Sequence, residues 1–115
     1  MTRKRLLTEF GMGSSLRRQD YTQAATRALK DALWHNSINL AELFGKDKAD
    51  MIIDVEVGVQ NPDALDIDTL VAVFPYGQIN ITPVKGGLDV PREVGNPTVI
   101  ANVAISVSLD LGDTT

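Results

Sequence analysis

Residues that can bind an anion gather in one short stretch of this chain, just before a predicted helix. The stretch contains two glycines, two serines and two arginines: Gly11, Gly13, Ser14, Ser15, Arg17 and Arg18. Glycine lets a ligand approach backbone N–H groups closely, and hydroxyl and guanidinium groups donate hydrogen bonds to anions. A helix that begins nearby adds free N–H groups and the positive end of its dipole. These residues are therefore the predicted ligand-binding residues, and a small anion is the predicted ligand.

The spacing matches neither of two familiar phosphate-binding patterns. A dinucleotide-binding turn has a third glycine where Leu16 stands, and a P-loop has a Gly-Lys-Ser/Thr run that this chain lacks. Several residues also separate Gly13 from Asp20, the predicted N-cap of the helix. The alternative interpretation is a tight exit from a strand, followed by a solvated basic loop.

Two carboxylates on one strand are the candidates for catalysis. Residues 51–59 alternate between apolar and polar side chains, so Asp54 and Glu56 project from the same side of a predicted strand. Paired carboxylates can exchange protons with a substrate, which makes these two candidates for a general base in a cleft between subunits. The alternative is a polar strand face without chemistry. With one histidine and no cysteine, no metal site and no cofactor are predicted.

Hydrophobic periodicity predicts the elements that position these residues. Asp20 and Asp66 are the predicted N-caps, and Gln23 stands at capping-box spacing from Asp20. The glycines from Gly11 onward are expected to leave the first strand as a loop. Strands are predicted at 5–10, 51–59, 78–84 and 98–111, helices at 20–35 and 66–74, one helical turn at 40–44, and an irregular excursion at 88–97.

The element order β-α-β-α-β-β predicts an α+β two-layer sandwich in a single domain, 1–115. Two helices can cover one face of a four-stranded mixed sheet. Small and polar side chains on the other face suit close stacking on another subunit, so a homo-oligomer is expected. The alternative is a one-sided sheet that faces water. The residues of that face are Ile52, Asp54, Glu56, Gly58, Asn80, Thr82, Asn102, Ala104, Ser106 and Ser108.

Composition limits the classes of function. The chain has 115 residues, of which 43% are hydrophobic and 23% charged, as expected for a globular domain. A net charge of −4 argues against nucleic acid as a partner. The basic residues 1–5 precede only two leucines, and no apolar run has the length of a signal peptide or a membrane span. No membrane partner is therefore predicted, and a cytoplasmic location is expected.

Several runs along the chain are similar to a known family. They are Gly11-Met12-Gly13, residues 19–25, the alanine-rich helix as far as His35-Asn36-Ser37, Val73-Phe74-Pro75-Tyr76-Gly77, and Gly86-Gly87-Leu88. Together they resemble the Lin-type family of conserved hypothetical proteins, small uncharacterised proteins of bacteria and plants, over nearly the whole chain. The family signature Gly-x-Gly-x-Asp-x-His-Gly matches at Gly11 and Gly13. Ser15 stands in place of its Asp, and Arg17 and Arg18 in place of its His and last Gly.

The resemblance implies no established activity. It implies a chain without the family's Asp and His, and so a non-catalytic paralogue that assembles with itself or with a sister chain. The element order also resembles the chorismate-mutase-like and tubulin C-terminal-like folds, which implies strand order 1-4-2-3 and trimers with clefts between subunits. The alternative function is an enzyme that acts on a small anionic metabolite in such a cleft. Arg17 and Arg18 would then bind the anion, and Asp54 or Glu56 would act as the base.

Overall fold

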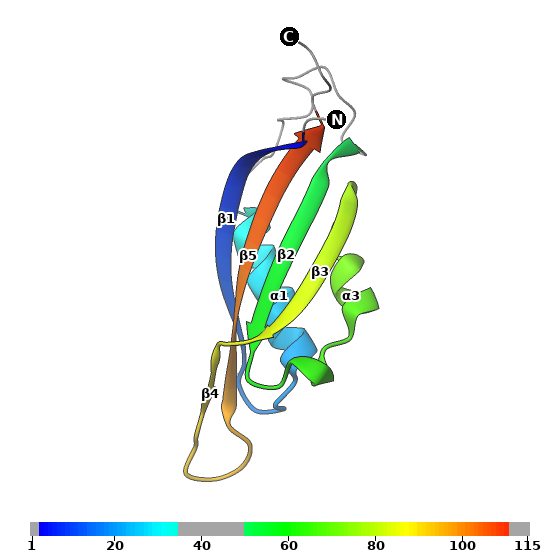
Figure 1. The fold of residues 1–115 in the computed structure, drawn as a ribbon. Coiled ribbons are helices and arrows are strands. Elements are labelled where there is room, and N and C mark those ends of the chain that lie inside the picture. Colours follow the sequence, from blue (N-terminus) through cyan, green and yellow to red (C-terminus); the bar gives the residue numbers. More distant parts are fainter. Residues whose placement is uncertain (1–2, 35–49, 111–115) are drawn as a thin grey trace.

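The computed structural model describes residues 3–34 and 50–110. A mixed sheet forms one layer, and the helices form a second layer on one of its faces (Figure 1). The predicted α+β two-layer sandwich is thus confirmed, while the helical turn predicted at 40–44 lies outside the described residues. The elements are β1 (Arg3–Ser15), α1 (Tyr21–Trp34), β2 (Ile52–Val59), the 3-10 turn η2 (Pro62–Ala64), α3 (Ile67–Val71), β3 (Gln78–Lys85), β4 (Leu88–Val90) and β5 (Thr98–Asp110).

The four long strands lie in the order β1-β5-β2-β3. Counting only the strands that the sequence predicts, this is the order 1-4-2-3. β5 is antiparallel to both β1 and β2, whereas β2 and β3 run parallel. The sheet therefore has β1 at one edge and β3 at the other. An edge position for β3 agrees with Pro83, which has no N–H to donate to a neighbouring strand.

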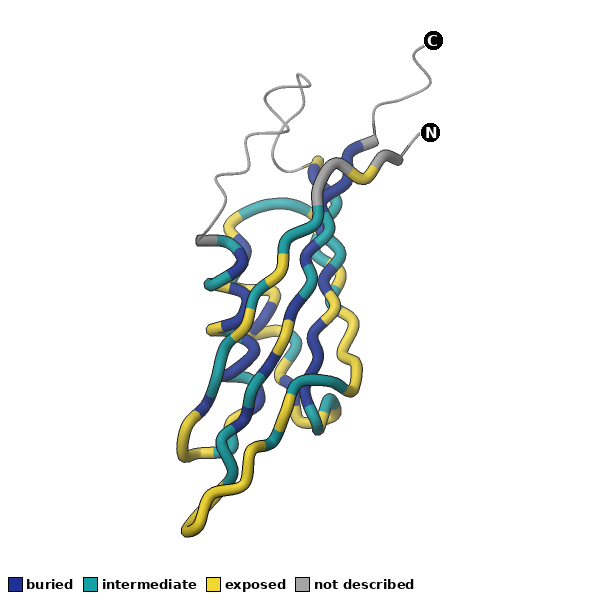
Figure 2. Tube along the Cα trace, turned by 90° about the vertical axis from the view of Figure 1, so that its left-hand side faces the viewer, coloured by how far each residue is buried: buried dark blue, intermediate teal, exposed yellow. Residues whose placement is uncertain are grey.

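A short fifth strand replaces part of the irregular excursion expected at 88–97. Leu88 to Val90 pair with residues 98–100 of β5, beyond the point where β2 ends. The prediction was wrong here because Pro91 and Pro97 lie just outside the paired residues and do not interrupt the pairing. The connection between β4 and β5 is exposed, as Figure 2 shows at the lower end of the molecule.

The core lies between α1, α3 and the inward side of the sheet. Alanines line the buried side of α1, and the alternate positions of β2 and β5 face them (Figure 2). Each fully buried valine, leucine or isoleucine contributes about 1.5–3 kcal/mol relative to exposure. The largest fully buried side chains include Leu29, Met51, Leu70, Ile105 and Leu109.

The glycines of the first strand are part of the strand, not of a loop. β1 continues to Ser15, and neither Gly11 nor Gly13 has a positive φ. Both glycines are needed for another reason. A β carbon at Gly11 would lie 2.7 Å from the backbone nitrogen of Ala32, and one at Gly13 would lie 2.7 Å from the carbonyl carbon of Arg27. The predicted glycine loop was wrong because these residues serve the close approach of α1 to β1.

The second helix is shorter than predicted. α3 ends at Val71, and the side chain of Val71 is exposed whereas that of Leu70 is fully buried. Asp66 is the N-cap, as predicted, because its carboxylate accepts a hydrogen bond from the N–H of Thr69 at 3.3 Å. Phe74 still reaches the core, because its N–H bonds to the carbonyl of Val71 and closes a turn after the helix.

Replacing Gly13 with alanine should lower the free energy of unfolding by at least about 2 kcal/mol, since the new β carbon must push α1 away from β1. Urea unfolding measures the change. The matched control is Gly58→Ala in β2, where the nearest atom to the new β carbon lies 3.4 Å away. That control should change stability by less than about 1 kcal/mol. Equal stability of the two variants would contradict this account of the packing.

Candidate functional site

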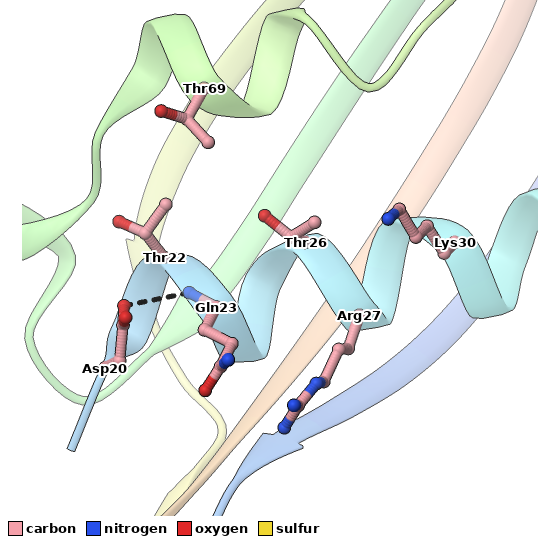
Figure 3. Close-up of a pocket in the computed structure, with 7 residues that line it drawn as sticks. All are labelled: Asp20, Thr22, Gln23, Thr26, Arg27, Lys30 and Thr69. Atoms are coloured by element: carbon pink, nitrogen blue, oxygen red, sulfur yellow. Dashed lines mark hydrogen bonds between the residues drawn. The ribbon is translucent and has the colours of Figure 1, made fainter. Parts of the chain in front are cut away.

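Side chains of this protein cap the N-terminus of α1. The carboxylate of Asp20 accepts a hydrogen bond from the N–H of Gln23 at 2.9 Å (Figure 3), so Asp20 is the N-cap, as predicted. The buried hydroxyl of Ser15 accepts from the N–H of Asp20 and donates to the side-chain carbonyl of Gln23, both at 3.3 Å. The second half of the predicted capping box therefore runs through Ser15 rather than directly from Gln23 to Asp20.

Three of the predicted ligand-binding residues lie under or against α1. Gly11 and Gly13 pack on its backbone, and Ser15 is fully buried. Ser14 is half-buried, and its carbonyl oxygen accepts a hydrogen bond from the guanidinium of Arg27 at 2.7 Å. Within one chain, the structure does not gather these residues around a common open space.

The two arginines lie beyond the end of β1 and are exposed. Gln19, at a φ of 51°, then turns the chain into α1. The positive end of α1 already holds the carboxylate of Asp20, and Asp89 bonds to a side chain of its first turn. Two carboxylates at one helix end weaken its attraction for a further anion. The anion site stays a prediction. Of the residues predicted to form it, the charged ones are Arg17 and Arg18, and both are exposed.

A buried tyrosine–carboxylate contact, which sequence reasoning missed, joins α1 to β4. Tyr21 is 8% exposed, and its hydroxyl donates a hydrogen bond to Oδ2 of Asp89 at 2.5 Å. Oδ1 of Asp89 is buried and has no hydrogen-bond partner among the described residues. The hydrogen bond to Asp89, and then burial, raise the pKa of Tyr21 above its ordinary value of 10.0. Sixty-eight positions separate the two residues, so no local pattern could reveal the pair.

The predicted catalytic carboxylates lie on the helix-free face, which we define as the face of the sheet opposite α1 and α3 (toward the viewer in Figure 1). Asp54 is half-buried and accepts a hydrogen bond from the side-chain amide of Asn80 at 3.2 Å, whereas Glu56 is exposed. Both border an open hollow of about 460 Å³. The other polar residues that line this hollow are Arg5, Thr8, Thr82 and Ser106.

A bulge in β1 brings Arg5 to the helix-free face. The register shifts between Arg5 and Leu7, so that Arg5 pairs with Ser108 and Leu7 pairs with Val107. In a regular strand Arg5 would face the side opposite to Thr8, but the shift places both on one side. Sequence reasoning missed Arg5 because no residue type marks the bulge.

The predicted base and the predicted anion-binding arginines lie far apart in one chain. Ser15 pairs with Val99 of β5, and Glu56 pairs with Ala104 of the same strand. At about 3.3 Å per residue, these two points on β5 are roughly 17 Å apart. Both arginines follow Ser15 in the chain, so a small metabolite cannot contact them and the carboxylates of the same copy.

A further open hollow, of about 370 Å³, lies between α1 and α3 (Figure 3). The hydroxyl of Thr22 accepts a hydrogen bond from the N–H of Asp66 at 2.9 Å, which holds the start of α3 against α1. None of the predicted ligand-binding residues lines this hollow. It is bordered by Asp20, Thr22, Gln23, Thr26, Arg27, Lys30 and Thr69.

Side chains of α1 also occupy part of the outer edge of β1. The guanidinium of Arg27 donates to the carbonyl of Ser14 at 2.7 Å, and the carboxylate of Asp31 accepts from the N–H of Met12 at 3.0 Å. An added strand would use these same backbone groups. At the opposite edge, Pro83 in β3 offers no N–H. Both sheet edges are therefore poor sites for pairing with another strand.

The described residues define a class of protein: a two-layer α+β fold in which α1 and α3 cover one face of the sheet and no described helix covers the other. Neither described helix combines the length and apolar character needed to cross a bilayer. The chain belongs to the family of conserved hypothetical proteins named Lin0512_fam, whose model matches residues 5–107. The predicted family resemblance is thus confirmed.

A solved structure agrees with this assignment. The chain is similar to the crystal structure of an FtsZ-like protein of unknown function from Nostoc punctiforme PCC 73102. The two share 34% sequence identity over 96% of this chain and 98% of the other, with a TM-score of 0.88. A comparison with curated proteins finds no match. The comparisons establish the family and the fold, and they assign no activity.

The Tyr21–Asp89 contact predicts a loss of stability at high pH. Because the pKa of Tyr21 is raised by folding, the folded protein keeps the phenolic proton where the unfolded chain releases it. The contribution is therefore fully present below about pH 10 and declines as the pH rises through the folded-state pKa. Urea unfolding between about pH 8 and pH 11 should show this decline in the parent protein.

Tyr21→Phe should flatten the decline, because it removes the titrating group. It should also lower stability at neutral pH by about 1–3 kcal/mol, through the lost hydrogen bond. Asp89→Asn is the matched control: it keeps an acceptor for the Tyr21 hydroxyl but removes the carboxylate charge, so it should give an intermediate slope. A Tyr21→Phe variant as sensitive to alkali as the parent would contradict the assignment.

Proposed function

We propose that this protein is an assembly protein, in which two copies associate through their helix-free faces. The observation that carries the proposal is the exposure of large apolar side chains on this face. Phe10 is 71% exposed and Met12 is 60% exposed. They pair with Ala104 and Asn102 of β5, which are small residues and not the long charged side chains of a solvated sheet. An apolar patch set among small residues is typical of an interface.

Some backbone groups at each of the two sheet edges are not available for strand pairing, which supports face-to-face association. Arg27 and Asp31 occupy backbone groups of β1 that a new strand would need, and Pro83 weakens the other edge. Association through the helix-free face therefore needs no edge hydrogen bonds, whereas strand pairing at either edge would have to displace or lack them.

The size of the face is sufficient for a small dimer interface. β2 has 8 residues, and with about 3.3 Å per residue and about 4.8 Å between strands the four-stranded region measures roughly 26 by 19 Å. Pairing two such faces removes about 1,000 Å² from water, which is near the lower limit for a specific interface.

The charges on the face favour a second copy as the partner. Arg5 carries a positive charge, and Asp54 and Glu56 carry negative charges, all on the same face. A surface with both signs can pair with itself, whereas nucleic acid or an anionic membrane requires a positive one. The fold resemblance implies a trimer instead of a dimer, and the measurement below distinguishes the two.

The test is the molar mass of the purified protein by light scattering, over a range of concentrations. The parent should approach twice the mass of one chain as its concentration rises. Ala104→Glu places a charge in the middle of the helix-free face, opposite Glu56, and should give a folded monomer whose melting temperature no longer depends on protein concentration. The control is Lys30→Glu, on the exposed side of α1, which should leave the dimer intact. A parent protein that stays monomeric at all concentrations would overturn the proposal, and a larger mass would point to the trimer.

A second candidate function is the binding, or chemical conversion, of a small anion between two copies. It is favoured by the 460 Å³ hollow, where Arg5 lies beside Asp54 and Glu56 on a face that a second copy would enclose. Enclosure strengthens electrostatic contacts and excludes water, which general acid–base chemistry requires. The exposed pair Arg17 and Arg18 would supply the anion contacts, reached from the other copy.

Replacing Arg17 and Arg18 together with alanine tests the anion site. Both side chains are exposed, so stability without ligand should change by less than about 0.5 kcal/mol per site. If the pair binds an anion, phosphate or sulfate should raise the melting temperature of the parent and not of the double variant. Equal shifts, or none in either protein, would exclude these arginines as the site. Dissociation of the variant without ligand would assign them to assembly instead.

A further inference from the structure

The helix-free face carries a projecting aromatic side chain next to an apolar hollow. The hollow has a volume of about 240 Å³ and lies beside Phe10. Gly58 of β2 and Ala104 of β5 form its floor, and Val84 of β3 stands on its far side. Gly58 is buried against the backbone of Gly86, so the half-buried Ala104 forms the open part of this floor, while the ring of Phe10 remains 71% exposed.

The size and lining of this hollow fit a side chain better than a metabolite. Small-molecule pockets usually have volumes of about 300–1,000 Å³ and several convergent polar groups. This hollow is smaller, and apart from Glu56 and Asn102 its lining consists of apolar side chains and glycines. An aromatic ring buries about 150–250 Å² when it is enclosed, which makes it a strong anchor for such a space.

We propose that Phe10 of each copy fills the Gly58–Ala104 hollow of the other copy. This inference rests on the proposed assembly through the helix-free face, and it names the contact that holds the two copies together. In a two-fold dimer the same patch meets itself, so a projection and a hollow on one patch satisfy each other twice. The two rings also lie near each other, since each Phe10 borders the hollow that the other ring enters.

The neighbours of Phe10 complete this contact. Met12 follows it on the same side of β1 and pairs with Asn102, in the cross-strand row that contains Gly58 and Val84. A flexible methionine adapts to an aromatic ring that enters beside it. The charged row with Asp54 lies one step further along the strands, at the polar end of the face. Glu56 shares the row of Phe10 and Ala104 and borders the hollow, so its carboxylate lies at the edge of the apolar contact, while Asp54 and Arg5 lie further along the strands.

Sedimentation equilibrium of single variants is the first test. Phe10→Ala should raise the dimer dissociation constant at least about tenfold, as expected for an aromatic anchor. Ala104→Leu fills the hollow and should raise it by a similar factor, without loss of thermal stability, because its side chain points into open space in a single chain. The matched control is Val94→Ala, which removes an apolar side chain that is 81% exposed on the β4–β5 connection, and it should leave the constant unchanged.

Mixing the two variants tests whether the contact is reciprocal. A Phe10→Ala copy keeps its hollow, and an Ala104→Leu copy keeps its ring, so a mixed dimer retains one complete contact. At the other contact, the copy without the ring faces the filled hollow, so nothing clashes there. Native mass spectrometry should therefore show mixed dimers in excess over both homodimers. A statistical mixture, or tighter dimers of Ala104→Leu, would overturn the Phe10 contact while leaving assembly through the face intact. A monomeric parent protein would instead overturn both.

Discussion

The close contact between α1 and the glycines of β1 is the constraint on which the rest of the structure depends. A β carbon at Gly11 or Gly13 would meet the backbone of α1, so the helix lies directly on the strand. At that distance, Arg27 and Asp31 reach around to the outer edge of β1 and bond to its backbone. The same approach brings the end of the strand to the start of the helix, where Ser15 joins them. One steric requirement thus places the helix, closes an edge and completes the cap.

Sequence periodicity was sufficient where an element is regular and its pattern is local. The alternation in β2 and β5 and the N-caps at Asp20 and Asp66 were predicted correctly, because each depends on neighbouring residues. The glycines were misread because a Gly-x-Gly run suits both a loop with positive φ and a strand packed against a helix. Only the position of α1 decides between them. β4 was missed for a similar reason: its three residues are held by pairing with β5, which the local sequence does not reveal.

The residues of the candidate site can also be divided into those that the sequence predicted and those that it did not. Asp54 and Glu56 were placed correctly on one side of β2, because the two-residue period holds along an uninterrupted strand. Arg5 was missed because a bulge changes the side on which it lies, and a shift of one residue exchanges the two faces. The link between Tyr21 and Asp89 joins elements that are distant in sequence. Site residues were therefore predictable within one regular element and unpredictable wherever they depend on how two elements meet.

The location of the core determines what association through the helix-free face can do. The buried apolar side chains lie between the helices and the inward side of the sheet, within one chain. Most of the hydrophobic stabilisation is therefore present before any second copy binds, and the helix-free face adds to a chain that already folds. The proposed association would bury roughly 1,000 Å², near the lower limit for a specific interface, and its extent would follow the protein concentration. Such an interface would determine whether the hollows on this face are enclosed, and not whether the chain folds. For this reason Phe10 and Ala104, rather than the core residues, are the positions where changes would separate the proposed assembly from the folding of one chain.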